Sequence, residues 1–246
     1  MLIKKTKIPF FSMVTIGMLP SFFKKIFYRF LGYRIGKKVK IGFGSIIVGE
    51  KVSIDNNVSI GFGSVIRARN IILNNFVSIG SFTMIDSESI HISEDARINE
   101  KVIIGGMKTP ESSLFLGKRV IIMEYSFINT TMPIKIGDDS GVGGHCLLFT
   151  HGSWLNQLEG YPVNFSSIII GKNVWLPWRV FIMPGTKIGD NVVVGANSLV
   201  SGEIDSNSLI AGSPAKVIKN NYPNPISNNK RKEHIPNIFL EFKKYL

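Results

Sequence analysis

The chain of 246 residues has a single cysteine, Cys146, which excludes an intramolecular disulfide framework and suits a reducing compartment. It also lacks a long uninterrupted apolar run. The N-terminal apolar stretch is broken by Pro9 and Pro20 and has no convincing cleavage site, so we expect neither a signal peptide nor a transmembrane helix. These absences favour a cytoplasmic protein, one that could work at the inner face of the cytoplasmic membrane.

Acidic residues are scarce. There are 17 Asp and Glu against 29 Lys and Arg, and the formal charge of +12 favours an anionic partner or surface. The basic residues gather near the two ends of the chain. They are Lys24, Lys25, Arg29, Arg34, Lys37, Lys38 and Lys40 at one end, and Lys230, Arg231, Lys232, Lys243 and Lys244 at the other. Neither cluster belongs to a nucleic-acid-binding motif, so we expect no nucleic acid partner.

An aliphatic residue returns every six positions through most of the chain, and a small or β-branched residue follows it four positions later. The cleanest run is Ile170, Leu176, Ile182, Ile188, Val194 and Val200, followed by Val174, Val180, Thr186, Val192 and Ser198. A period of six fits neither the helical period of 3.6 nor the alternation of an ordinary strand. It predicts an all-β hexapeptide-repeat parallel β-helix, in which each flat side points one aliphatic side chain inward.

Nearly the whole chain keeps this register, from Ile35 to Val200, over roughly twenty hexads. A β-sandwich is the alternative, but its irregular loops would not hold one register. We therefore expect an N-terminal amphipathic helical segment over residues 1–34, a β-helix over 35–219, and a C-terminal tail over 220–246 with a short helix around Ile238 to Tyr245.

The segment from Ser21 to Leu31 has a strongly amphipathic helical pattern. Its apolar face consists of Phe22, Phe23, Ile26, Phe27, Phe30 and Leu31, with Lys24, Lys25 and Arg29 largely off that face. Two interpretations remain open. The helix could cap the open end of the β-helix, or it could lie on an anionic membrane with its aromatic side chains at the headgroup boundary. One helix could do both.

Two long interruptions break the repeat, from Gly106 to Phe115 and from Phe149 to about Ser167. Loops that leave a rigid repeat often carry function. His151 stands at the start of the second interruption, and histidine exchanges protons best near neutrality. Of the other histidines, we expect His91 at a corner, His145 pointing outward from the repeat, and His234 solvated in the tail.

Several segments resemble the hexapeptide-repeat acyltransferases, in particular the bacterial polysaccharide O-acetyltransferases and the maltose and galactoside acetyltransferases. They are Thr150-His151-Gly152, Ile170-Gly171-Lys172-Asn173-Val174-Trp175-Leu176, Met183-Pro184-Gly185-Thr186-Lys187-Ile188-Gly189-Asp190-Asn191 and Ala211-Gly212-Ser213-Pro214-Ala215-Lys216-Val217-Ile218. The resemblance implies a left-handed β-helix, a homotrimer and acetyl-CoA as acyl donor. It also implies that His151 is the general base and that Trp175 positions donor or acceptor beside it, although Trp175 could equally serve packing.

The resemblance places acetyl-CoA in the groove between neighbouring prisms. The positions that match the family's donor site are Trp178, Ala196, Ser201, Gly202, Lys216 and Lys219. Two positions depart from the family pattern: Trp178 replaces a small residue, and Gly202 replaces a lysine, so one phosphate contact could be missing. Glu124 is the only carboxylate available for the acidic acceptor-binding role, and a solvated face is the alternative for it.

Cys146 occupies a small inward position of the repeat, where burial would raise the pKa of its thiol, so we expect a core residue. Some left-handed β-helix enzymes, the γ-class carbonic anhydrases, hold zinc with three histidines. Because the spacing of His91, His145 and His151 does not match their pattern, we expect no metal.

These observations predict an O-acetyltransferase that acts on a hydroxyl of a cell-surface glycan or its lipid-linked precursor. The acceptor would attack the thioester directly, with His151 as general base and without a covalent enzyme intermediate. Two alternatives remain. One is an N-acetyltransferase of a nucleotide-linked amino sugar, although no separate nucleotide-sugar domain is visible over residues 1–34. The other is a non-catalytic trimeric β-helix scaffold.

Overall fold

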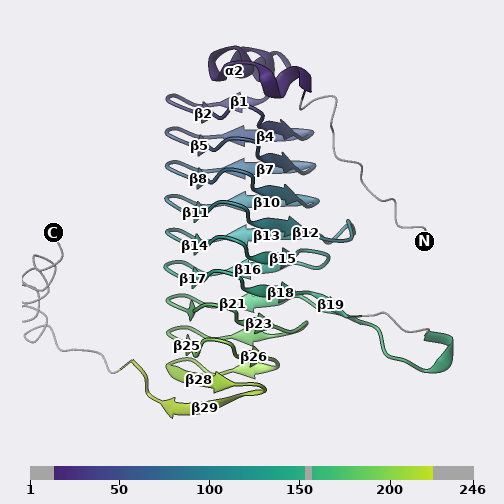
Figure 1. The fold of residues 1–246 in the computed structure, drawn as a ribbon, viewed down its shortest axis with the longest axis vertical. Coiled ribbons are helices and arrows are strands. Elements are labelled where there is room, and N and C mark those ends of the chain that lie inside the picture. The colour runs from purple at the N-terminus through teal and green to yellow at the C-terminus, as the bar shows by residue number, and fades with distance from the viewer. Residues whose placement is uncertain (1–13, 153–156, 224–246) are drawn as a thin grey trace, which may run out of the picture.

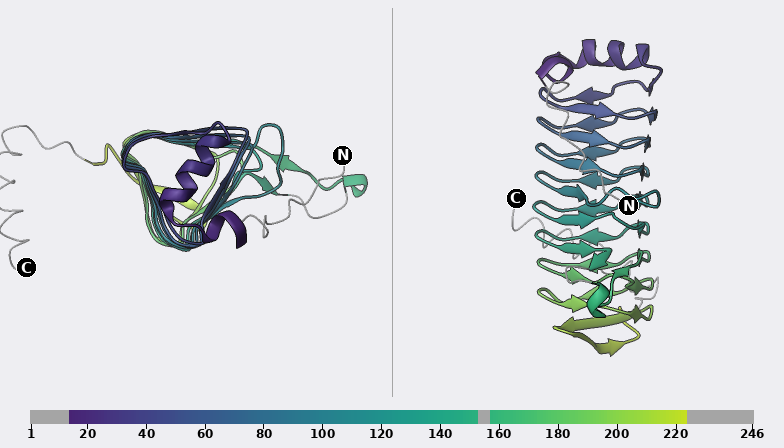
Figure 2. Two further views of the ribbon diagram at one scale, coloured as in Figure 1. Left: turned by 90° about the horizontal axis from the view of Figure 1, so that it is seen from above. Right: turned by 90° about the vertical axis from the view of Figure 1, so that its right-hand side faces the viewer.

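Three parallel β-sheets form the walls of a triangular prism, around which the chain winds coil by coil (Figure 1). The computed structural model describes residues 14–152 and 157–223. Seen along its length, the prism has a triangular outline, and one corner carries the segments that project farthest from it (Figure 2). The predicted all-β, left-handed parallel β-helix of hexapeptide repeats is confirmed.

Each sheet takes one strand from each coil. Sheet A consists of β1 (Arg34–Ile35), β4 (Lys51–Ile54), β7 (Asn70–Leu73), β10 (Ser89–Ile92), β13 (Ser113–Leu116), β16 (Ile134–Ile136), β21 (Ile168–Ile170), β24 (Lys187–Ile188) and β27 (Glu203–Ile204). Sheet B consists of β2 (Lys40–Ile41), β5 (Ser59–Ile60), β8 (Ser78–Ile79), β11 (Arg97–Ile98), β14 (Ile121–Ile122), β17 (Gly141–Val142), β22 (Trp175–Leu176), β25 (Val193–Val194), β28 (Ser208–Gly212) and β29 (Ala215–Asn220). Sheet C consists of β3 (Ile46–Val48), β6 (Val65–Arg67), β9 (Met84–Asp86), β12 (Ile103–Gly105), β15 (Phe127–Asn129), β18 (Leu147–Phe149), β23 (Phe181–Ile182) and β26 (Leu199–Val200).

The aliphatic residue of each hexad points into the prism. All six residues from Ile170 to Val200 in the cleanest run are at most 2% exposed, and each lies beside its equivalent in a neighbouring coil, as Ile170 does beside Ile188. The small residue four positions later is buried at the turn, where a hydroxyl can satisfy backbone groups. The Ser64 hydroxyl, for example, donates to the carbonyl of Gly80 (2.8 Å) and accepts from the N–H of Thr83 (3.1 Å). This pairing explains why the position tolerates Ser and Thr.

One histidine lies elsewhere than predicted. His91 is not at a corner: it sits inside β10 on the outer face of sheet A, where its Nε2 lies 3.0 Å from Oδ1 of Asn74. Its ring meets that of Phe115 edge-on, with centroids 5.1 Å apart. The residues before Ile92 thus belong to a four-residue strand and not to a turn.

Helix α2 (Ser21–Phe30) follows a short 3-10 helix, η1 (Ile16–Met18), and lies across the N-terminal end of the prism (Figure 1). Of the two interpretations left open for this helix, the structure shows the capping position. At the other end, β29 pairs antiparallel with β28 and closes the last coil. The predicted helix around Ile238 to Tyr245 and His234 lie outside the described residues. No helix within the described residues has the length and apolar character needed to cross a bilayer.

Candidate active site

Both long interruptions leave the prism at the same corner. We call the three corners the A/B, B/C and C/A edges, after the sheets that each one joins. The segment 106–112 connects β12 to β13 at the C/A edge, and the hairpin of β19 (His151–Gly152) and β20 (Asn164–Phe165) leaves the same edge one coil beyond β15 (Figure 2). A 3-10 helix, η2 (Gln157–Glu159), follows within this second excursion. The two interruptions of the repeat thus lie close to each other along the C/A edge.

His151 lies at this C/A edge, where the chain leaves β18 of sheet C, and is half-buried. Its Nδ1 is 3.1 Å from Oδ1 of Asn129. That oxygen also accepts the backbone N–H of Thr131 at 3.2 Å, and because a backbone N–H can only donate, the Asn129 atom must be the acceptor. Nδ1 of His151 therefore carries the proton and donates it to Asn129. The lone pair is left on Nε2, as a general base requires.

Asn129 is held rigidly by its own neighbours. It is 4% exposed, and its Oδ1 lies 3.1 Å from the hydroxyl of Thr150, which also donates to the Asn129 carbonyl at 2.8 Å. A Cβ on Gly106 would lie 2.8 Å from Nδ2 of Asn129, so only glycine leaves room for the amide there. The first interruption thus helps to fix the residue that orients the histidine of the second.

The surroundings of His151 keep its imidazole neutral. Phe165, its cross-strand neighbour in the hairpin, stacks on the ring with centroids 5.5 Å apart and an interplanar angle of 19°. Burial lowers the pKa of His151 from its usual value of 6.5. At neutral pH, a base with this pKa is unprotonated and available.

The structure does not bring Trp175 to His151 within one protomer. Trp175 begins β22 in sheet B, just past the A/B edge, whereas His151 lies at the C/A edge. A Cβ on Gly141 would lie 2.5 Å from the Trp175 ring, so the indole packs flat over that glycine in the preceding coil. It also lines a groove of about 270 Å³ that includes Arg119 and Asp139. Trp175 is 38% exposed, so its indole packs on one side only, and its positioning role stays a prediction.

The matched donor-site residues fall into separate groups. Trp178 and Ala196 stand in successive turns of the B/C edge, joined by a hydrogen bond from Asn197 N–H to the Trp178 carbonyl (3.1 Å). Ser201 and Gly202 lie two turns beyond His151 on the C/A edge, and a Cβ on Gly202 would meet nothing within 4 Å. Sheet C separates these two edges in one protomer.

Lys216 and Lys219 form a third group, on β29 at the end of sheet B. Both side chains are exposed, and the Lys219 ammonium lies 5.7 Å from the centre of the Tyr222 ring. Two cations at this end of the prism could meet phosphates of a nucleotide.

His145 points outward, as predicted, and stacks with Tyr125 at 5.0 Å, with Trp178 at 6.0 Å on the other side. Glu124 shares this B/C edge and accepts a hydrogen bond from the amide of Asn99 (3.1 Å), away from the C/A edge of the same protomer. Within residues 14–152 and 157–223, no three His, Cys, Asp or Glu side chains are grouped as a metal-binding set.

Cys146 is fully buried, and burial raises the pKa of its thiol to about 11. Its Sγ lies 3.0 Å from the carbonyl of Pro177, so the thiol fills the inward slot as a weak donor. The predicted core role is confirmed.

The sequence reasoning missed Asn129 and Phe165. Asn129 ends a strand one coil before the histidine, and nothing in its local pattern distinguishes it from other turn residues. One signal was available in the sequence. Both interruptions come after the same one of the three hexads that make up a coil, so the residues beside them must lie at one edge of the prism.

Comparisons with known proteins agree with this fold. Residues 167–202 match the family model described as bacterial transferase hexapeptide (six repeats). A putative lipopolysaccharide biosynthesis O-acetyl transferase of Escherichia coli, WbbJ, is 36% identical over 117 residues, which cover 43% of this chain and 60% of that protein. A putative colanic acid biosynthesis acetyltransferase of Escherichia coli, WcaF, is 32% identical over 123 residues, 42% of this chain and 68% of that protein.

The crystal structure of the polySia specific acetyltransferase NeuO covers 80% of this chain and 82% of its own, with a TM-score of 0.56 and 17% identity, a likeness of fold alone. The chain spans less than two thirds of the first relative, WbbJ. The repeat, the motifs and the match to WcaF agree with one another. The chain belongs to the hexapeptide-repeat acyltransferase family.

Proposed function

We propose that the protein transfers an acetyl group from acetyl-CoA to a hydroxyl of a cell-surface glycan or its lipid-linked precursor. The observation that carries this proposal is the hydrogen bond from Nδ1 of His151 to Asn129 (3.1 Å), which leaves Nε2 as a base at the edge of the prism. A scaffold would have no need of an imidazole with a fixed tautomer and a lowered pKa.

The reaction needs little beyond positioning and one base. Nε2 of His151 accepts the proton as the acceptor oxygen attacks the thioester carbonyl and forms the new C–O bond. The tetrahedral intermediate then collapses, the C–S bond breaks, and the leaving thiolate takes the proton from the imidazolium. Because Asn129 is uncharged, it stabilises the imidazolium only through its amide dipole, and the histidine returns readily to its neutral form.

The placement of the matched residues supports a homotrimer. Trp178 and Ala196 on the B/C edge and Ser201 with His151 on the C/A edge would have to contact one donor molecule. Since sheet C separates these edges in one protomer, we infer that the B/C edge of one protomer faces the C/A edge of the next. Three such head-to-tail contacts close a ring with three equivalent sites.

The relatives support the class of acceptor. WbbJ and WcaF are named for lipopolysaccharide and colanic acid biosynthesis, and both are described as acetyl transferases. In keeping with an acceptor of that kind, we place the protein in the cytoplasm at the inner face of the membrane.

The purified protein should release coenzyme A from acetyl-CoA only when a suitable glycan is present. His151→Ala should lower this rate by about 10²–10⁴, and glycan NMR of a deletion strain should show a missing O-acetyl signal relative to its parent. If the deletion strain lacks an N-acetyl signal and keeps its O-acetyl signals, the protein is an N-acetyltransferase of an amino sugar. Unchanged glycan acetylation in cells that carry His151→Ala would favour the scaffold.

A further inference from the structure

Helix α2 packs on the prism with its polar side. Lys24 and Tyr28 are buried against the first coil, whereas the aromatic residues of the opposite side face outward. Phe22 is 64% exposed, Phe23 55% and Phe30 87%. Further exposed apolar residues nearby are Val14, Met18, Leu19, Ile26, Phe27 and Leu31. A solvent-facing helix of a water-soluble protein has the opposite orientation.

The first coil explains this orientation. The end of a parallel β-helix presents unpaired backbone groups, which need hydrogen bonds, and the end of its apolar interior, on which the Tyr28 ring packs. The Lys24 ammonium donates to the carbonyls of Gly42 (2.5 Å) and Ser45 (3.0 Å). The Tyr28 hydroxyl accepts the N–H of Ile47 (2.9 Å), and the Ser21 hydroxyl accepts that of Ile41 (3.0 Å). The polar side is therefore used internally, and the apolar side is left for an external partner.

The segment that carries this face is rich in positive charge. Residues 14–49 contain seven Lys and Arg and no acidic residue. Arg29, Arg34, Lys37 and Lys40 are exposed, and among the ion pairs of residues 14–152 and 157–223 none includes any of them. An apolar patch bordered by unpaired cations complements an anionic lipid surface.

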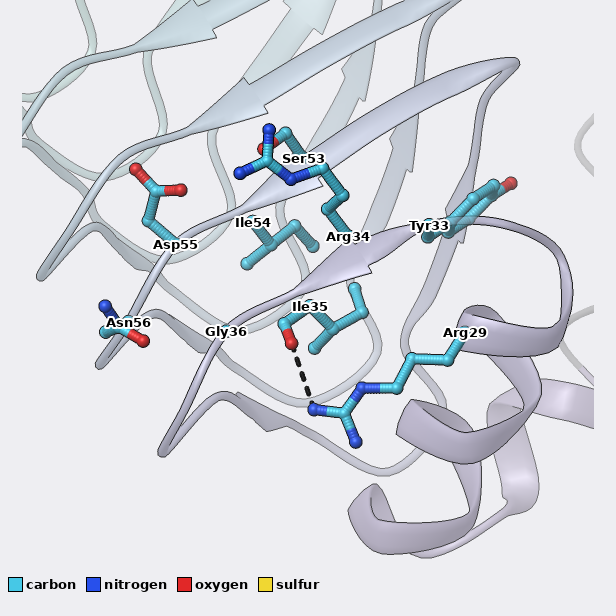
Figure 3. A pocket seen from close by; sticks show the side chains of 9 residues that line it. All are labelled: Arg29, Tyr33, Arg34, Ile35, Gly36, Ser53, Ile54, Asp55 and Asn56. Atoms are coloured by element: carbon cyan, nitrogen blue, oxygen red, sulfur yellow. Dashed lines mark hydrogen bonds between the residues drawn. The ribbon is translucent and has the colours of Figure 1, made fainter.

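A groove beside the helix adds a place for a headgroup. It has a volume of about 470 Å³ and lies between the end of α2 and the first two strands of sheet A (Figure 3). Two cations, Arg29 and Arg34, and one carboxylate, Asp55, line it, so the charged side chains of the groove sum to +1. Arg29 donates from Nη2 to the carbonyl of Ile35 (2.9 Å), which holds its guanidinium in place. A lipid phosphate is an acceptor suited to such guanidinium groups.

We propose that α2 docks the protein on an anionic bilayer, its aromatic face buried at the headgroup boundary and the prism standing on end above it. The helix has ten residues and is about 15 Å long, so it lies on the membrane and does not cross it. In a trimer with parallel prisms, three such helices would share one end and bind together.

The upright orientation sets the height of the active site. Five coil spacings of about 4.8 Å separate β1 from β16, the coil that ends at His151, and the helix adds to this distance. If the proposed acetyl transfer is correct, the acceptor hydroxyl must lie about 30 Å from the bilayer surface. Such a site favours a sugar distant from the lipid over one attached directly to it.

Flotation with phosphatidylcholine vesicles, with and without phosphatidylglycerol, tests the docking on the full chain. We expect binding that needs phosphatidylglycerol and weakens with ionic strength. The double variant Phe23→Asn/Phe30→Asn should lower the partition coefficient at least about tenfold. Lys37→Gln/Lys40→Gln should lower it by a smaller factor. The matched control is Phe76→Asn, which removes a phenylalanine of similar exposure (54%) from the third coil.

Neutron reflectometry on a supported bilayer tests the orientation, with an upright protein layer expected to be about 50 Å thick. Binding that is absent, or is unchanged by Phe23→Asn/Phe30→Asn, would overturn the proposal. A particle of twice the trimer mass that dissociates in Phe23→Asn/Phe30→Asn would also overturn it, since the aromatic face would then bind a second copy of the protein and not a bilayer. Flotation requires no acetyl transfer, so its failure and that of the proposed activity are distinguishable.

Discussion

Asn129 and His151 stand on consecutive coils of the prism, and Oδ1 of the first lies 3.1 Å from Nδ1 of the second. This hydrogen bond keeps the proton on Nδ1 and so leaves Nε2 as the imidazole nitrogen that can act as a base. An amide at this position fixes the tautomer without adding a charge, whereas a carboxylate would also stabilise the imidazolium.

Asn129→Asp should therefore change the pH dependence of activity. In the native protein, burial holds the pKa of His151 below 6.5, so the acidic limb of kcat/KM should have its midpoint below that value. A carboxylate beside Nδ1 favours the protonated ring and should raise the midpoint by about one unit or more. Asn173→Asp, at an exposed turn of the A/B edge, should leave the profile unchanged. An acidic limb that stays in place in Asn129→Asp would show that another group controls it.

Subunit mixing should reveal a shared site. His151→Ala disables the C/A edge of a protomer, and Ala196→Trp blocks its B/C edge. Co-folding equal amounts of two inactive variants should restore about one quarter of wild-type activity, because one site in four then joins two intact edges. Mixing of preformed, non-exchanging trimers is the control and should restore none. Failure of the co-folded sample would place the whole site within one protomer.

Stability should depend on the close contact between coils. A Cβ on Gly143 would lie 2.7 Å from the carbonyl carbon of Pro177 in the next coil, and backbone atoms there cannot swing aside. Gly143→Ala should cost about 1–3 kcal/mol of unfolding free energy, measured by denaturant titration. Gly152→Ala, where the added carbon would meet nothing within 4 Å, should change it little. Equal effects of the two substitutions would contradict the packing argument.

The sequence predicted the prism because one physical requirement repeats in every coil: an aliphatic side chain must fill the interior of the prism. Ile182, for example, is fully buried there. It also predicted the inward thiol of Cys146. The orientation of α2 was not predictable, because an amphipathic pattern shows that a helix has two faces but not which one meets the protein. Asn129 was missed for a related reason. Its role depends on a contact between coils 22 residues apart, and no local period reports that contact.

Lys24 should make stability depend on pH in the alkaline range. Burial lowers the pKa of its ammonium from 10.5 to about 8, so the folded protein releases this proton before the unfolded chain does. Below pH 8 both states are protonated and the full desolvation cost is present. Between about pH 8 and 10.5 the cost declines, and the unfolding free energy should rise relative to that of Lys24→Met, which has no proton to release. Paired denaturant titrations of the two proteins at several pH values measure this difference. A difference that stays constant from pH 7 to 10 would mean that the ammonium at the carbonyls of Gly42 and Ser45 keeps an ordinary pKa.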